Sequence, residues 1–66
     1  MSSNSLTPRE LQVVRYSHLT FEEMGEKLGI SPRTAKYDTD RVRWKLGVRH
    51  KRHLQDRCRE LGIRYD

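Results

Sequence analysis

The sequence predicts an all-α fold of four short helices in one small domain. The chain has 66 residues, which suffice for one core but not for two, since domains take roughly 50–200 residues. Helix-capping residues and glycines bound four segments of helix length. Within these segments apolar residues recur every three or four positions, and no alternating apolar and polar run of strand type competes with this pattern.

The first helix is expected to begin directly after Thr7. Thr7 is the predicted N-cap, Pro8 occupies the first turn, where its missing N–H costs nothing, and Glu10 is placed to complete a capping box. The helix is then expected to run from about Pro8 to Ser17 or His18.

Two further helices follow with a short turn between them. Thr20 opens a second Thr-x-x-Glu capping box, and this helix is expected to stop before Gly29, which can supply a left-handed residue. Ser31 is the predicted N-cap of the third helix, which is expected to run to Leu46 before Gly47 ends it. The buried side of the third helix is predicted by the helical spacing of Ala35, Thr39, Val42 and Leu46.

The fourth helix is expected over residues 51–61, before Gly62. Its apolar stripe consists of Leu54, Cys58 and Leu61. These side chains must close the core of the monomer, so little apolar surface remains for a partner chain. We interpret Cys58 as a small apolar residue in the core or at a dimer contact rather than as a redox sensor, because a reactive thiol needs exposure and a lowered pKa.

The second and third helices are joined only by residues 29–31, and a short glycine-containing turn of this kind is typical of a helix-turn-helix. In such units the second helix enters the major groove of duplex DNA. We therefore expect the third helix of this chain to be the recognition helix. Its outward face, opposite the apolar stripe at 100° per residue, comprises Arg33, Lys36, Tyr37, Asp40, Arg41 and Trp44.

The positive charge of the chain is concentrated in one region. The net charge is +5, which favours an anionic partner. Residues 31–59 hold ten bases and three acids, a net +7, whereas residues 1–30 and 60–66 each carry −1. Because the basic region includes the predicted recognition helix, we interpret it as a contact surface for DNA phosphates. A solvated basic face is the alternative interpretation.

Composition argues against several other classes of protein. A single cysteine permits no internal disulfide, and no apolar run approaches the roughly 18 residues of a membrane span, so a cytoplasmic protein without a membrane partner is expected. His50 and His53 lack a third ligand for a metal, and the neighbours Ser17 and His18 cannot face each other as nucleophile and base. We therefore expect no enzyme activity, metal, cofactor or small-molecule ligand.

Four segments resemble the LuxR/GerE-type DNA-binding domain in their order and nearly in their spacing: Leu6-Thr7-Pro8-Arg9-Glu10, Leu28–Lys36, Lys45-Leu46-Gly47-Val48-Arg49 and Arg59-Glu60-Leu61-Gly62. The most specific are Ser-Pro-Arg-Thr-x-Lys and Lys-Leu-Gly-Val-Arg. The resemblance implies a stand-alone effector domain over residues 6–63, without a receiver or ligand-sensing domain. Residues 1–5 would form a flexible N-terminus and residues 64–66 a C-terminal tail.

The resemblance implies a transcription regulator that binds double-stranded DNA as a homodimer. Its base-facing positions match Lys36, Tyr37 and Asp40, to which the outward face adds Trp44. Lys36 would donate to guanine and Asp40 would accept from a cytosine amino group. The positions expected to contact the DNA backbone are Arg33, Thr34, Arg41, Lys45, Arg49, Lys51 and Arg52. The fourth helix would contribute the dimer contact through Leu54, Cys58 and Leu61.

Some positions depart from the family pattern. Asp38 replaces a usual histidine, Asp40 replaces a neutral or basic residue, and Arg43 replaces an apolar residue. The segment from Arg33 to Asp40 therefore has no net charge, and pairing of Lys36 with Asp40 and of Asp38 with Arg41 would explain these acids without base recognition. The link between the first two helices is also shorter than usual and lacks its glycine, which allows the first helix to end early.

The outward aromatic residues support a second hypothesis. Tyr37 and Trp44 are seven residues apart, and Trp, Tyr and Arg dominate protein-binding hot spots. A face of Tyr37, Asp40 and Trp44 would then bind a protein of the transcription machinery or a cognate regulator. Alternatively, Trp44 folds back over a neighbouring helix. A module like region four of sigma factors shares residues 20–25, but the Lys-Leu-Gly-Val-Arg element favours the LuxR/GerE type.

Overall fold

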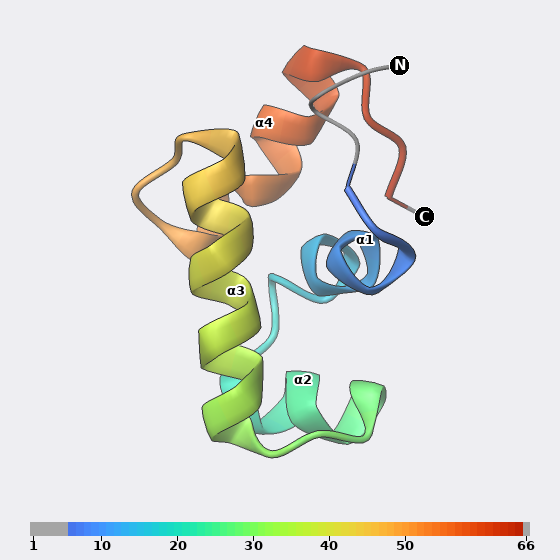
Figure 1. Cartoon of the computed structure of the whole chain (residues 1–66), viewed down its shortest axis with the longest axis vertical. Coiled ribbons are helices and arrows are strands. Elements are labelled where there is room, and N and C mark those ends of the chain that lie inside the picture. Colours follow the sequence, from blue (N-terminus) through green and yellow to red (C-terminus); the bar gives the residue numbers. More distant parts are fainter. Residues whose placement is uncertain (1–5, 66) are drawn as a thin grey trace.

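The computed structural model describes residues 6–65, and these residues form helices and no strand (Figure 1). The elements are α1 (Pro8–Arg15), α2 (Phe21–Leu28), α3 (Pro32–Leu46), the single 3-10 turn η1 (Lys51–His53) and α4 (Leu54–Leu61). The predicted all-α fold of four helices is therefore confirmed. The expected flexible N-terminus, residues 1–5, lies outside the described residues. Within residues 6–65, no helix has the length and apolar character needed to cross a membrane.

Both predicted capping boxes are present. The Thr7 hydroxyl accepts a hydrogen bond from the Glu10 amide at 3.1 Å, and the Glu10 carboxylate accepts one from the Thr7 amide at 2.9 Å. Thr20 and Glu23 repeat this exchange, with both distances at 3.1 Å. Each cap satisfies amides that have no partner inside the helix, so these short helices have well-defined starts.

The end of α1 lies earlier than the expected Ser17 or His18, because α1 stops at Arg15. The Ser17 hydroxyl donates to the carbonyl of Val14 at 2.8 Å, and its amide turns to the same carbonyl at 3.1 Å. Gln55 of α4 donates to the carbonyls of Val14 and Arg15 at 3.2 and 3.1 Å. The last carbonyls of α1 are thus satisfied from outside the helix, which confirms the alternative of an early end.

The expected helix over residues 51–61 is divided into η1 and α4. His50 provides no side-chain cap for the first turn, which closes instead through a 3-10 bond from the His53 amide to the His50 carbonyl at 3.0 Å. The side chain of Lys51 in this turn contacts the segment around the start of α2. Its ammonium group donates to the carbonyl of Leu19 and lies 5.1 Å from the centre of the Phe21 ring.

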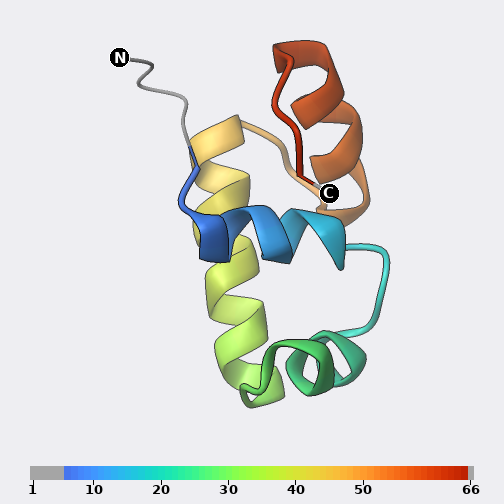
Figure 2. The ribbon, with the colours of Figure 1, turned by 90° about the vertical axis from the view of Figure 1, so that its right-hand side faces the viewer.

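The core lies between α3 and the other helices, which pack along one side of α3 (Figures 1 and 2). Its fully enclosed apolar side chains come from all four α-helices: Val13, Val14, Met24, Ala35, Val42, Leu46, Leu54 and Cys58. The predicted inner stripe of α3 is confirmed, including its polar member Thr39. The Thr39 hydroxyl is satisfied in the core by donating to the Ala35 carbonyl at 2.8 Å, so its burial leaves no unpaired group.

The turn between α2 and α3 brings the two helices into close contact. Gly29 ends α2 with a φ of 71°, and the Ile30 amide returns to the carbonyl of Gly25 at 2.9 Å. A Cβ at Gly25 would lie 2.5 Å from the Ile30 carbonyl oxygen, closer than real Cβ atoms approach backbone. This close approach fixes the helix-turn-helix geometry and leaves the opposite side of α3 uncovered.

Candidate nucleic-acid interface

The side of α3 that faces away from the core carries the residues expected there. Arg33, Lys36 and Arg41 are exposed, Tyr37 has 62% of its surface accessible, and Asp40 is partly buried. Thr34 is exposed in the first turn, where the Ser31 hydroxyl caps its amide at 3.1 Å. The recognition-helix face predicted from the sequence is therefore accessible in the folded chain.

Trp44 lies on this same face with 88% of its surface accessible, so the alternative in which it folds back over a neighbouring helix is wrong. The indole lies away from the buried stripe of α3, which includes Val42 and Leu46. The Arg41 guanidinium lies 6.0 Å from the centre of the Tyr37 ring, within reach of a cation–π contact. A shallow hollow on this face is lined by Tyr37, Asp40, Arg41, Arg43 and Trp44.

Asp38 lies toward α1 and not on the outward face. Its carboxylate pairs with the guanidinium of Arg9 at 3.3 Å, so the expected ion pair with Arg41 is wrong. The reason is packing, since α1 crosses α3 (Figure 2) and carries Arg9, which reaches Asp38. The first of the two acids that depart from the family pattern is thereby neutralised within the chain.

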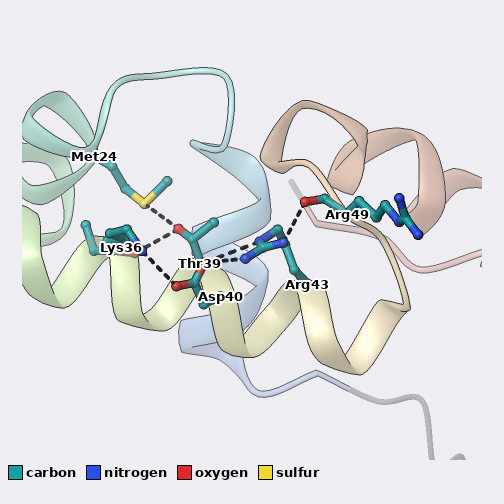
Figure 3. A network of polar contacts seen from close by, with 7 residues as sticks. Met24, Lys36, Thr39, Asp40, Arg43 and Arg49 are labelled. Carbon is teal, nitrogen blue, oxygen red and sulfur yellow. Dashed lines mark hydrogen bonds and ion pairs between the residues drawn. The ribbon is translucent and has the colours of Figure 1, made fainter.

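Asp40 is held by two cations of its own helix (Figure 3). The expected pair with Lys36 is confirmed at 3.1 Å, and Arg43 approaches the other carboxylate oxygen at 2.7 Å. The hydrogen bond from Arg43 has the largest effect and lowers the pKa of Asp40; burial opposes it, and the contact with Lys36 lowers the pKa further, so that the pKa is lowered overall. Sequence analysis missed the contact of Asp40 with Arg43, although their spacing of three residues in a helix was a usable signal.

Arg43 also reaches the loop after α3. Its Nη1 donates to the backbone carbonyl of Arg49 at 2.5 Å, while Nε and Nη2 remain on Asp40. The guanidinium therefore connects the outward face of α3 to the loop that carries Arg49 (Figure 3). Arg43 thus has two polar partners at a position where the resemblance described above led us to expect an apolar residue.

The residues expected to contact the DNA backbone fall into two groups. Lys45 pairs with Glu10 of α1 at 2.7 Å, and Lys51 donates to the Leu19 carbonyl, so both are engaged within the chain. Burial raises the pKa of Glu10, but the hydrogen bond from Lys45 and the Thr7 cap outweigh it and lower the pKa overall. The exposed arginines without an acidic partner among residues 6–65 include Arg33, Arg41, Arg49 and Arg52.

Two of the three residues expected at a dimer contact lie in the core of the single chain. Leu54 and Cys58 are fully buried, so neither side chain offers surface to a partner, whereas Leu61 is 39% exposed. Burial raises the pKa of the Cys58 thiol, which fits its interpretation as a small apolar core residue. The rings of His50 and His53 are 5.8 Å apart, and residues 6–65 hold no group of three or more potential metal ligands.

The comparisons with known proteins agree with this architecture. The family described as "Bacterial regulatory proteins, luxR family" matches residues 4–57, which include α1, α2, α3 and the first turn of α4. No curated protein and no solved structure gives a significant match. The family is one of DNA-binding regulators, and its match covers most of the chain. The chain therefore belongs to the LuxR family of bacterial regulatory proteins and forms its helix-turn-helix DNA-binding domain.

Proposed function

We propose that this chain is a transcription regulator that recognises a specific sequence in double-stranded DNA, reading the major groove with α3, and that it acts as a homodimer. The observation that carries this proposal is the exposed face of α3, which presents polar and aromatic side chains next to exposed arginines that have no acidic partner within residues 6–65. In a helix-turn-helix this face meets base edges. Lys36, Tyr37, Asp40 and Trp44 are assigned to the bases.

The exposed arginines are assigned to phosphates. Arg33 lies in the first turn of α3, where the positive end of the helix dipole also favours a phosphate, and Arg41 lies farther along that helix. Arg49 and Arg52 follow α3 in the basic region. Lys45 and Lys51 are assigned a supporting role, because their contacts with Glu10 and with the Leu19 carbonyl hold α3 and η1 in place. Thr34 adds a hydroxyl at the start of α3.

A salt titration of duplex binding tests the proposal. Each phosphate contact steepens the fall of log K with log salt by about 0.9, so Arg49→Gln and Arg52→Gln are each expected to reduce the slope by about 1 for every sequence. Arg15→Gln is the matched control, because Arg15 is an exposed arginine of α1 and does not belong to the proposed DNA-binding face of α3. Absence of duplex binding even at low salt would refute the proposal.

A protein-binding function is the second candidate, and the accessibility of Trp44 and Tyr37 favours it. The occupant of this face would be a protein of the transcription machinery or a cognate regulator. Trp44 is the single tryptophan, so its fluorescence reports on this face alone. A change on adding duplex that salt reverses supports DNA binding, whereas silence toward duplex and a change with purified RNA polymerase support the second function.

The homodimer is proposed through the exposed side of α4, where Leu61 is the accessible member of the expected contact. A two-fold dimer would place two α3 helices on successive turns of the duplex, so half-sites would be about 10 base pairs apart. Sedimentation with and without duplex measures the state directly. A single chain bound per duplex at all concentrations would exclude the two-fold arrangement.

A further inference from the structure

Four groups on and beside the outward face of α3 form a continuous chain of polar contacts (Figure 3). The Lys36 ammonium donates to Oδ2 of Asp40 at 3.1 Å. Oδ1 of Asp40 accepts from Nη2 and Nε of Arg43 at 2.7 and 3.3 Å, and Nη1 of Arg43 donates to the Arg49 carbonyl at 2.5 Å. The two oxygens of Asp40 thus have different partners.

These two partners differ in how firmly they are held. The Arg43 side chain is 28% exposed, and its guanidinium group is held by two partners, the Asp40 carboxylate and the Arg49 carbonyl. The Lys36 side chain is 62% exposed, and within residues 6–65 its ammonium group has Asp40 as its single ion-pair partner. Exposed pairs of this kind are weak and screened by salt. Oδ1 is therefore held by contacts within the domain. Oδ2 is an acceptor and the Lys36 ammonium a donor, and the two lie side by side on the outward face of α3.

A G·C base pair presents the complementary arrangement in the major groove. Guanine offers the acceptors O6 and N7, and cytosine offers its N4 amino group as a donor. O6 and N4 are hydrogen bonded to each other at about 2.9 Å, which matches the 3.1 Å between the Lys36 ammonium and Oδ2 of Asp40. A T·A pair also places an acceptor beside a donor, but it has the thymine methyl where guanine has N7.

We propose that Lys36 and Asp40 act together as one reader of a G·C base pair, with Arg43 as the positioning residue that holds Oδ1 and turns Oδ2 toward cytosine. This inference rests on the proposed major-groove function of α3. Lys36 would donate to O6 and N7 of guanine without leaving Asp40, and Asp40 would accept from N4 of cytosine. The lowered pKa of Asp40 is consistent with a carboxylate that remains ionised at neutral pH.

Selection from a random duplex pool measures the preference of each variant. The wild-type protein is expected to enrich G·C at one position of each half-site by on the order of tenfold over T·A. Lys36→Met and Asp40→Ala are expected to lose this preference at that position alone. Lys27→Met is the matched control, because Lys27 is an exposed lysine of α2. Enrichment that Lys36→Met and Asp40→Ala leave unchanged at every position would overturn the inference.

Base analogues in the selected duplex locate the contact. Inosine opposite cytosine keeps O6, N7 and the N4 amino group and removes only the minor-groove amino group, so binding is expected to be retained. A T·A pair, or 7-deazaguanine, which lacks N7, is expected to weaken binding several-fold. Loss of binding with inosine would place the readout in the minor groove and refute the reader.

A double-mutant cycle separates positioning from a structural role of Arg43. Arg43→Met is expected to reduce the G·C preference, and adding it to Asp40→Ala should reduce the preference no further, since Arg43 acts through Asp40. A merely structural role of Arg43 would lower binding to all sequences and leave the ratio of G·C to T·A binding unchanged. If Arg43→Met does not fold, as circular dichroism would show, Lys36→Met on the exposed surface still decides the inference. No binding of the wild-type protein to any duplex would refute the proposed function itself, whereas binding without this preference would refute only the inference.

Discussion

Gly25 determines how closely α2 and α3 approach. Gly25 is buried inside α2, and there is no room for a side chain because an added Cβ would lie 2.5 Å from the Ile30 carbonyl oxygen. A glycine inside a helix normally weakens it by roughly 0.5–1 kcal/mol relative to alanine. The loss is tolerated here because the close approach sets the angle at which α3 leaves the turn.

Gly25→Ala is therefore expected to destabilise the domain by about 1–3 kcal/mol, opposite in sign to the usual effect of alanine in a helix. The added Cβ would lie 2.5 Å from backbone oxygen, and backbone yields less easily than a side chain. Urea unfolding measures the change. Glu26→Ala is the control, since Glu26 is exposed on the same helix, and a Gly25→Ala protein as stable as this control would contradict the explanation.

At the level of elements, helix starts could be predicted from the sequence and one helix end could not. The starts at Thr7, Thr20 and Ser31 depend on residues three positions away, so the pattern is visible in the chain itself. The end of α1 depends on Gln55, which is 41 positions from Val14 and reaches it only in the folded chain. The short link without a glycine indicated that α1 could end early, but a distant side chain leaves no local pattern that would place the end at Arg15.

Gln55→Ala tests whether this contact holds α1 to α4. The substitution removes the side-chain donor of the Arg15 carbonyl and one of the two side-chain donors of the Val14 carbonyl, which keeps the Ser17 hydroxyl. A loss of about 0.5–1.5 kcal/mol in the free energy of unfolding is expected. Gln12→Ala is the matched control, because Gln12 is exposed on α1. Equal stability of the two variants in urea would show that α1 needs no donor from α4.

At the level of the whole molecule, the candidate site was predictable in its position but not in its electrostatics. The outward face of α3 follows from the helical period, which is why Lys36, Tyr37 and Trp44 lie where they were expected. The partners of Asp38 and Lys45 are on α1, and only the packing of α1 across α3 brings them together. From the sequence alone, Lys45 is assigned to the DNA backbone and Asp38 to an ion pair with Arg41, whereas the fold pairs both residues with α1.

The ion pair between Glu10 and Lys45 predicts how the stability of the domain depends on pH. A carboxyl whose pKa is lower in the folded chain than in the unfolded chain stabilises the fold above its unfolded value, and this contribution is lost as the pH falls through the folded value. The pKa of Glu10 is lowered from its ordinary value of 4.5, so the loss is expected below that pH. Glu10→Gln should therefore cost about 1 kcal/mol or less at pH 7, because Lys45 is partly exposed, and should flatten the decline in stability between pH 5 and pH 3.

Thermal unfolding of both proteins across this range measures the effect. Glu23→Gln is the control that separates loss of the ion pair from any change in the cap, since Glu23 closes the capping box of α2 without an ion pair among residues 6–65. A Glu10→Gln protein that loses stability as steeply as the wild type would show that this contact between α1 and α3 contributes nothing to the pH dependence of folding.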